Sequence, residues 1–270
     1  MPEDYFIGVH RRELERLKDQ NAAWRPETQA LWKNAGFHSG QHLADLGSGP
    51  GFSALDLAEV AGPSGKVAAV DKASPFLEFL DDETQRRGID NVYTVEADLT
   101  RIDAIEGSFD GAFCRFLLAF LIDDLDRVLE SVYRSLKPGG VLAAMEYLTL
   151  SSTTCSPPIR GFDAHTQAWI RYYANNGGDT SIGAYLPERL TRAGFEISYT
   201  HSAGGVAHPS HRWWKWWGRL IDDFGAKLVS DGLMTADELK HLQHDWAEIS
   251  KRPDAFIHTP TLLQLVARKK

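Results

Sequence analysis

Hydrophobic positions between residues 42 and 148 form short apolar runs that alternate with segments of helical spacing. Apolar runs of roughly four to eight residues are typical of buried strands, and a period near 3.6 indicates helices. The pattern predicts strands at 42–46, 66–71, 91–96, 109–114 and 141–148, and helices at 51–61, 74–87 and 123–136. This alternation predicts a parallel sheet with helices on both faces.

Two helix boundaries carry local sequence signals. Ser74 and Pro75 combine an N-cap residue with a proline at the first helical position, which predicts the start of the helix 74–87. The sequence Lys-Pro-Gly-Gly at 137–140 follows the helix 123–136. A cation, a proline and glycines in this order end a helix, so the next strand is expected from Val141.

The chain on either side of this core follows a different pattern. Residues 10–36 predict amphipathic helices, with Pro26 at the start of a second one. A Ser/Thr/Pro-rich loop is expected at 151–160. Beyond it the pattern predicts helices at 163–173 and 186–192, strands at 196–201 and 261–268, and a tryptophan-rich helical stretch at 205–258.

Composition excludes several classes of protein. The formal net charge of the 270-residue chain is −8 and no long Lys/Arg run occurs. The overall charge therefore does not favour binding to nucleic acid or to acidic membranes. Cys114 and Cys155 are too few for a disulfide framework or a zinc site, and no set of side chains has metal-ligand spacing. The absence of metal-ligand spacing predicts an enzyme without a catalytic metal. Because neither a secretory signal nor an apolar run of about 18 residues occurs, we expect a soluble cytoplasmic protein.

The first predicted strand runs into a glycine-rich turn, Asp45-Leu46-Gly47-Ser48-Gly49-Pro50-Gly51. Glycines in such a turn let backbone N–H groups approach a ligand at the helix N-terminus. The spacing G-x-G-x-G differs from the G-x-G-x-x-G of dinucleotide-binding proteins, and no Gly-Lys-Ser/Thr of a P-loop follows. The spacing therefore favours a ligand other than a phosphate.

Acidic residues end the next two predicted strands. Asp71 ends the second strand and Asp98 the third, so both are expected at the carboxyl edge of the sheet. An acid in the position of Asp71 can reach ribose hydroxyls, and Asp98 can accept a hydrogen bond from an adenine amine. The fourth strand would bring Cys114, Arg115 and Phe116 to the same edge.

With these motifs in this order, residues 40–150 resemble the class I methyltransferases that use S-adenosylmethionine (SAM). The glycine-rich first motif of the family matches residues 45–51, and its acids after the second and third strands match Asp71 and Asp98. Its L-K-P-G-G sequence matches residues 136–140, and residues 116–121 are similar to its stretch after the fourth strand. Among subgroups, the chain is most similar to the ubiquinone/menaquinone-biosynthesis type and related small-molecule methyltransferases.

The resemblance implies a Rossmann-like, doubly wound α/β fold with helical lid insertions. Its seven-stranded sheet would be mostly parallel, with an antiparallel last strand. Residues 1–36 would form an N-terminal helical lid and residues 37–150 the SAM-binding core. The remainder, 151–270, would complete the sheet with about 182–203 and 259–270 and carry caps at about 151–180 and 205–258.

The resemblance also implies roles for single residues. Gly47 and Gly49 would pack under the methionyl part of SAM, Asp71 would bind the ribose and Asp98 the adenine. Arg115 is explained equally well as a surface residue after a strand. The residues predicted to bind the cofactor, whose product is S-adenosylhomocysteine, are Asp45, Gly47, Ser48, Gly49, Gly51, Asp71, Lys72, Ala97, Asp98, Leu99 and Arg115.

A general base, where the acceptor needs one, is expected among His165, His201 and Glu146. Imidazole titrates near neutral pH, which suits proton transfer, and Glu146 follows the fifth strand toward the predicted site. His208 and His211 lie in the same insertions. Each histidine is also explained as a solvent-exposed or core residue.

The tryptophans at 213–217 have two interpretations. Together with Trp169, Tyr172 and Tyr173 they could line an aromatic or lipophilic acceptor pocket. Alternatively, aromatic residues at helical spacing dock their helix on the sheet. Four neighbouring tryptophans cannot all face one direction, so both interpretations can hold together.

The sequence predicts an enzyme that moves the methyl group of SAM to an O, N or C nucleophile of a small aromatic or lipophilic metabolite. As a monomer or homodimer it would bind no nucleic acid and insert into no membrane. Because SAM carries the activation, alignment and exclusion of water are the main tasks of the protein.

Three alternatives stay open. A SAM-binding regulatory or interaction module would have an intact cofactor loop beneath a filled acceptor pocket. An aminopropyltransferase would need a paired-Asp signature after the fourth strand, where this chain has Cys-Arg-Phe-Leu at 114–117. A nicotinamide oxidoreductase would bind NAD in place of SAM.

Overall fold

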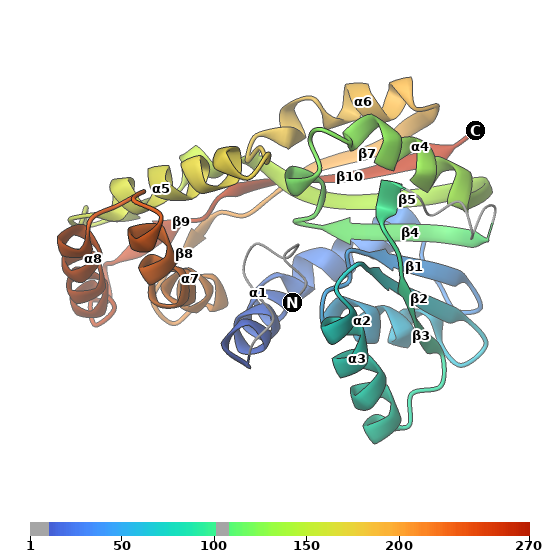
Figure 1. The fold of residues 1–270 in the computed structure, drawn as a ribbon, viewed down its shortest axis with the longest axis horizontal. Helices are drawn as coiled ribbons and strands as arrows, with labels where there is room; N and C mark the ends of the chain where they lie inside the picture. Colours follow the sequence, from blue (N-terminus) through green and yellow to red (C-terminus); the bar gives the residue numbers. More distant parts are fainter. Residues whose placement is uncertain (1–10, 101–107) are drawn as a thin grey trace.

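A seven-stranded sheet forms the centre of the protein in a computed structural model, which describes residues 11–100 and 108–270 (Figure 1). Its strand order is β3-β2-β1-β4-β5-β10-β7, and β10 is the strand that runs antiparallel to both of its neighbours. The strands are β1 (His42–Leu46), β2 (Lys66–Asp71), β3 (Val92–Glu96), β4 (Phe109–Arg115), β5 (Leu136–Thr149), β7 (Phe195–Ala203) and β10 (Thr261–Lys269). The predicted fold class is confirmed.

Helices cover the sheet and extend beyond it. Helices α2, α3, α4 and α6 pack beside the strands, while α5, α7 and α8 gather at one end of the molecule (Figure 1). The bounds are α1 (Arg11–Ala35), α2 (Phe52–Ala61), α3 (Ser74–Arg87), α4 (Leu125–Ser135), α5 (Phe162–Asn175), α6 (Leu186–Arg192), α7 (Arg212–Ser230) and α8 (Ala236–Ile249). Within the described part of the chain, no helix is both long enough and apolar enough to cross a bilayer.

The prediction that Pro26 starts a second helix is wrong, because α1 continues through it. A proline inside a helix removes one backbone hydrogen bond and costs about 3 kcal/mol. Trp24, Leu31 and Trp32 flank Pro26 on both sides and are at most 1% exposed. Burial of these side chains keeps both halves of the helix on the core, and tertiary packing outweighs the local penalty.

Two further details differ from the predicted pattern. Strand β5 already begins at Leu136, with the Lys-Pro-Gly-Gly sequence as an irregularity within it, since Phe109 pairs with Leu136 and Gly111 with Val141. In addition, β6 (Thr154–Ser156), β9 (Phe256–His258) and β8 (Val206–Ala207) form a small antiparallel sheet. Strands of two or three residues are too short to show an alternating pattern.

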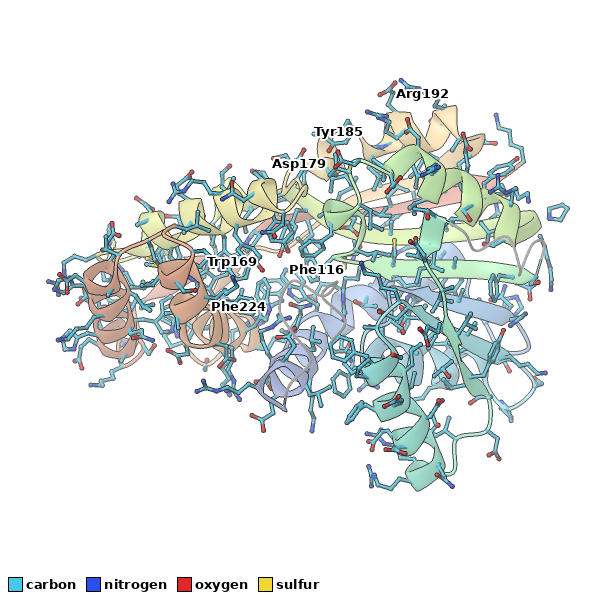
Figure 2. All side chains as sticks on the ribbon, in the orientation of Figure 1. Phe116, Trp169, Asp179, Tyr185, Arg192 and Phe224 are labelled. Carbon is cyan, nitrogen blue, oxygen red and sulfur yellow. The ribbon has the colours of Figure 1, made fainter. Side chains whose placement is uncertain are left out.

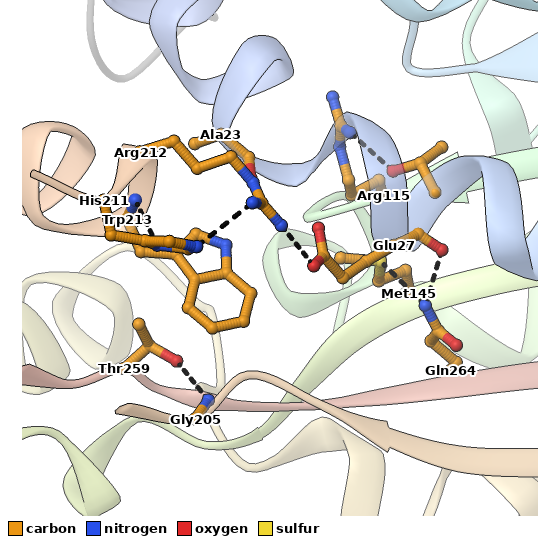
Figure 3. A network of polar contacts seen from close by, with 11 residues as sticks. Ala23, Glu27, Arg115, Met145, Gly205, His211, Arg212, Trp213, Thr259 and Gln264 are labelled. Atoms are coloured by element: carbon orange, nitrogen blue, oxygen red, sulfur yellow. Dashed lines mark hydrogen bonds and ion pairs between the residues drawn. The ribbon is translucent and has the colours of Figure 1, made fainter. Parts of the chain in front are cut away.

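Helix α1 is joined to the sheet and to α7 by charged and polar side chains (Figure 3). Arg115 at the end of β4 donates to Thr28 Oγ1 at 2.7 Å. Gln264 of β10 donates to the carbonyl oxygen of Glu27 at 2.7 Å. From the other side, Arg212 of α7 forms an ion pair with the Glu27 carboxylate. Helix α1 therefore connects the sheet with the helices at the end of the molecule.

Tryptophan contacts form the apolar part of the same junction. The Trp24 ring lies 5.1 Å from the ring of Trp213 and 5.3 Å from that of Trp216. Trp214 instead stacks on Trp246 of α8, with the ring centroids 4.1 Å apart. Most of the tryptophan cluster therefore docks α7 against α1 and α8.

Replacement of Trp24 by alanine tests this junction. We expect Trp24→Ala to lower the free energy of unfolding by about 3–5 kcal/mol, because it leaves a cavity between two helices. Urea denaturation followed by circular dichroism measures the loss. Val206→Ala is the control, since Val206 is 57% exposed and should change stability by less than about 0.5 kcal/mol. Equal stability of both variants would contradict the packing role of Trp24.

Candidate cofactor and acceptor site

A cavity of about 360 Å³ opens at the carboxyl edge of the sheet. Helices α1, α5 and α7 contribute side chains to its wall opposite the strand ends. Phe116 and Trp169 lie in this region between the sheet and the helices α5 and α7 (Figure 2). In an open parallel sheet, ligands bind outside the carboxyl ends of the strands, so this cavity is the expected place for a cofactor.

The structure brings together every residue predicted to bind the cofactor except Gly51. Gly51 lies just beyond the wall, at the N-terminus of α2, with φ +77°. A side chain there would run into Leu80, so this glycine serves helix packing. The predicted residues that line the cavity are Asp45, Gly47, Ser48, Gly49, Asp71, Lys72, Ala97, Asp98, Leu99 and Arg115.

The glycine-rich turn needs its glycines for two different reasons. Gly47 and Gly49 adopt φ of +64° and +52°, a left-handed conformation that side chains disfavour. A Cβ on Gly47 would also collide with the side chain of Leu117, whereas nothing lies within 4 Å of the position of a Cβ on Gly49. Gly47 is therefore the position where the residues after β4 approach the turn most closely.

Asp71 ties the end of β2 to the glycine turn. Its Oδ2 accepts a hydrogen bond from the Gly49 N–H at 2.7 Å, and its Oδ1 accepts one from the Ala73 N–H at 2.9 Å. Burial raises the pKa of Asp71, and the hydrogen bonds from Ala73 and Gly49 oppose that rise. Each carboxylate oxygen can accept a further hydrogen bond, which leaves room for a pair of hydroxyl donors.

Asp45 presents a buried carboxylate to the cavity. The residue is 2% exposed, and its Oδ2 has no hydrogen-bond partner among the described residues. Burial raises the pKa of Asp45 to about 7, and the positive charge of Arg115 opposes that rise. A buried oxygen of this kind is stabilised by a cation or a donor group. The amino group of a SAM methionyl moiety has that chemistry, so the site fits the cofactor.

Asp98 lies at the outer end of the cavity. Its Oδ1 accepts hydrogen bonds from the Thr100 N–H at 2.9 Å and from the Thr100 hydroxyl at 2.8 Å. These bonds close a local turn after β3, and Leu99 beside it is buried. An acid and an apolar side chain at the third strand end suit an adenine ring.

Arg115 is part of the cavity wall but is held by the protein itself. Its guanidinium group donates to Thr28, to Asn21 Oδ1 at 2.7 Å and to Ser53 Oγ at 3.0 Å. Burial lowers the pKa of Arg115 to about 10, and the charge of Asp45 opposes that change. The contacts join β4 to α1 and α2, so Arg115 closes the cavity between these elements.

The half of the cavity away from the glycine turn is mainly apolar and aromatic. Its polar side chains include Arg16, which is 4% exposed and pairs with Glu13. Sequence reasoning missed Arg16 because it is one of several charges on an amphipathic helix. The apolar and aromatic lining residues of this half are Leu17, Phe116, Phe120, Leu121, Tyr147, Leu150, Trp169, Tyr173, Trp217 and Leu220.

The predicted general bases are not among the side chains that line this cavity. His165 is fully buried between Trp169 and Trp217, and burial lowers its pKa to about 3. His201 is exposed on β7, the last strand of the sheet. Glu146 is fully buried, behind the residues that follow β4. None of the three is brought together with the cofactor residues.

Comparisons with known proteins identify the family of this chain. Residues 43–140 match the family model described as a methyltransferase domain. The ubiquinone/menaquinone biosynthesis C-methyltransferase UbiE of Pseudomonas putida is 30% identical over 197 residues, which cover 65% of this chain and 75% of the relative. That of Haemophilus ducreyi is 27% identical, over 68% of this chain and 78% of the relative. The chain belongs to the class I SAM-dependent methyltransferases, of the UbiE type.

The solved structures support the fold of this methyltransferase. A structure titled as a putative sarcosine dimethylglycine methyltransferase from Galdieria sulphuraria has a TM-score of 0.61 and 16% sequence identity. The match covers 99% of this chain and 93% of that chain. The methyltransferase uses SAM. An open cavity beside the glycine turn differs from the filled acceptor pocket expected of a regulatory module.

Alanine at Gly47 tests the contact between the glycine turn and Leu117. We expect Gly47→Ala to weaken SAM binding by at least about tenfold, or roughly 1.4 kcal/mol, because strain and the collision both displace the turn. Isothermal titration calorimetry measures the affinity. Gly88→Ala is the control, since Gly88 has φ +65° but open space around it. It should lose stability and keep its SAM affinity; equal SAM affinity of both variants would contradict the role of Gly47.

Proposed function

We propose that this methyltransferase methylates a flat, largely apolar acceptor that carries an acidic oxygen. The proposal rests on one observation: the glycine turn and the aromatic side chains of the far half line a single cavity. We call the half beside the glycine turn the cofactor half and the far half the acceptor half. Aromatic side chains provide large apolar contact surfaces for a planar molecule. A cavity of about 360 Å³ is in the size range of small-molecule sites.

The cofactor half suggests a role for each acid. We assign Asp71 to the ribose hydroxyls and Asp98 to the adenine, as the family pattern implies. Asp45 would receive the methionyl ammonium group, because its buried Oδ2 lacks a partner among the described residues. Gly47, Ser48 and Gly49 would lie under the methionyl chain.

The acceptor half contains hydroxyl donors beside a buried cation. Tyr147 and Tyr173 share a hydrogen bond and are 7% and 5% exposed. Burial raises the pKa of Tyr147 to about 12 and that of Tyr173 well above its ordinary value, so both hydroxyls stay protonated at neutral pH. Arg16 lies close enough to oppose both shifts. This group would stabilise an oxygen of the acceptor in its ionised form.

The chemistry then depends mainly on alignment. When bound, SAM supplies a methyl group on a sulfonium sulfur. The nucleophilic atom of the acceptor would form a bond to that carbon as the carbon–sulfur bond breaks, S-adenosylhomocysteine would leave, and the acceptor would release a proton to solvent. No histidine lines the cavity among the residues that the structure describes. An acceptor already ionised beside Arg16 and the tyrosines would need no imidazole base.

The names of the relatives suggest the first acceptor to test. The proteins of Haemophilus ducreyi and Pseudomonas putida are named as C-methyltransferases of ubiquinone and menaquinone biosynthesis. We therefore propose a ring carbon of a hydroxylated aromatic molecule as the nucleophile. Incubation with SAM and a panel of such phenols, followed by mass spectrometry, should show the gain of one methyl group. If amines or carboxylic acids are methylated and every phenol is refused, the proposed acceptor class is wrong.

Asp71→Ala tests the cofactor half. Removal of this carboxylate should weaken SAM binding at least about tenfold, the effect of one lost hydrogen bond to a charged group. Isothermal titration with SAM and with S-adenosylhomocysteine measures the change. Glu96→Ala removes an exposed carboxylate from the end of β3 as a control and should bind SAM like the wild type. Unchanged affinity in Asp71→Ala would remove Asp71 from the ribose role.

Tyr173→Phe tests the acceptor half. Loss of its hydroxyl should raise the acceptor KM about tenfold, on the scale of one hydrogen bond, and leave the Kd for SAM unchanged. Steady-state kinetics and calorimetry measure the two constants separately. Tyr93→Phe is a matched control, because Tyr93 is 37% exposed on β3. A Tyr173→Phe enzyme with wild-type KM would show that this hydroxyl does not contact the acceptor.

A further inference from the structure

The turn after β4 is unusual in its backbone conformation. Phe116 has φ +55° and is the sole described residue other than glycine with a positive φ. Leu117, which follows it, is right-handed with φ −110° and ψ −54°. A left-handed residue of this kind is unfavourable unless surrounding contacts enforce it, and such residues cluster at functional sites. The turn therefore needs a partner that holds it.

This turn reaches both halves of the cavity. Phe116 lines the acceptor half, where its ring lies 5.0 Å from the ring of Tyr147. The side chain of Leu117 occupies the space beside Gly47 in the glycine turn. A shift of residues 116–118 would therefore displace the acceptor wall and the support of the glycine turn together.

Glu146 holds the turn from behind. Its Oε1 accepts hydrogen bonds from the backbone N–H groups of Leu117 at 2.8 Å and Leu118 at 2.9 Å. Successive N–H groups in a turn that combines left- and right-handed residues form a concavity that binds an anion. Here the anion is a side chain of the protein itself. Glu146 is fully buried on β5 and is absent from the cavity wall, whereas its neighbour Tyr147 belongs to it.

We infer that Glu146 is a positioning residue, whose carboxylate oxygen holds the left-handed turn at Phe116 and so places Phe116 and Leu117 in the cavity. It acts through the turn and does not touch the acceptor. Burial raises the pKa of Glu146 to about 7, against the hydrogen bonds from the turn. The N–H groups partly replace the water that the carboxylate loses. The inference concerns the geometry of the turn and rests on the proposed function for its effect on catalysis.

Two substitutions separate this role from that of a general base. Glu146→Gln keeps an oxygen that can accept both N–H groups, and Glu146→Ala removes it. In Glu146→Ala we expect amide hydrogen exchange at Leu117 and Leu118 to accelerate at least about tenfold, because the turn opens locally. Glu146→Gln should keep most of the protection. Two-dimensional NMR of the labelled protein measures each amide, and Glu188→Ala, at an exposed position of α6, is the control.

Steady-state kinetics of the two variants also distinguish a positioning role of Glu146 from a role as general base. With a phenol that the wild type methylates, Glu146→Ala should lose about a hundredfold in kcat/KM, since small misplacements of bound groups are this costly. Glu146→Gln should remain within about threefold of the wild type, because its oxygen restores the turn. A general base would give equally inactive Gln and Ala variants with normal amide protection, and that result would overturn the inference. If Glu146→Ala does not fold, the Gln variant decides on the same criteria.

Measurements on the wild-type protein distinguish failure of the inference from failure of the proposed function. A wild-type protein that binds no SAM or methylates no phenol contradicts the proposed function, while the amide exchange still reports on the turn. A wild type that methylates phenols, with equal Leu117 and Leu118 exchange in all variants, contradicts the positioning role alone.

Discussion

The closure of the cavity depends on the guanidinium group of Arg115. This cation stands at the end of β4 and donates to Thr28 and Asn21 of α1 and to Ser53 of α2. Helix α1 carries Arg16, Leu17 and Gln20 into the cavity wall. Because partly buried polar groups need their partners, loss of Arg115 would leave all three acceptors without this donor. One strand end thus orients the helix that covers the site.

The cavity combines two acids of limited exposure, Asp45 and Asp71, with an apolar wall in the acceptor half. Burial raises the pKa of Asp45 and Asp71, and at Asp71 the N–H groups of Gly49 and Ala73 offset part of that effect. The buried carboxylate of Glu146 likewise accepts hydrogen bonds from backbone N–H groups, those of Leu117 and Leu118. Backbone N–H groups are fixed dipoles, so they hold carboxylates without a neutralising cation.

Much of the cofactor half could be predicted from the sequence, since it depends on local rules. Asp45, Asp71 and Asp98 lie at or within two residues of the ends of strands that are recognisable by their apolar runs, and parallel strands place such ends on one edge. The acceptor half could not be predicted in this way. Trp169 and Trp217 belong to the aromatic residues for which the sequence allows an acceptor pocket as one of two interpretations. Arg16 and Tyr147 come from other elements, and no local pattern shows that all four side chains face one cavity.

The sequence by itself determined the order of strands and helices between residues 42 and 148, the glycine turn and the family, because periodicity, turn chemistry and motif spacing are properties of neighbouring residues. Only the tertiary structure decided that α1 runs straight through Pro26, that His165 and His201 lie apart from the cavity and that Glu146 supports a turn. The reason is the same in each case. Burial and hydrogen bonding between distant segments set the position of a side chain, and these contacts leave no trace in local spacing.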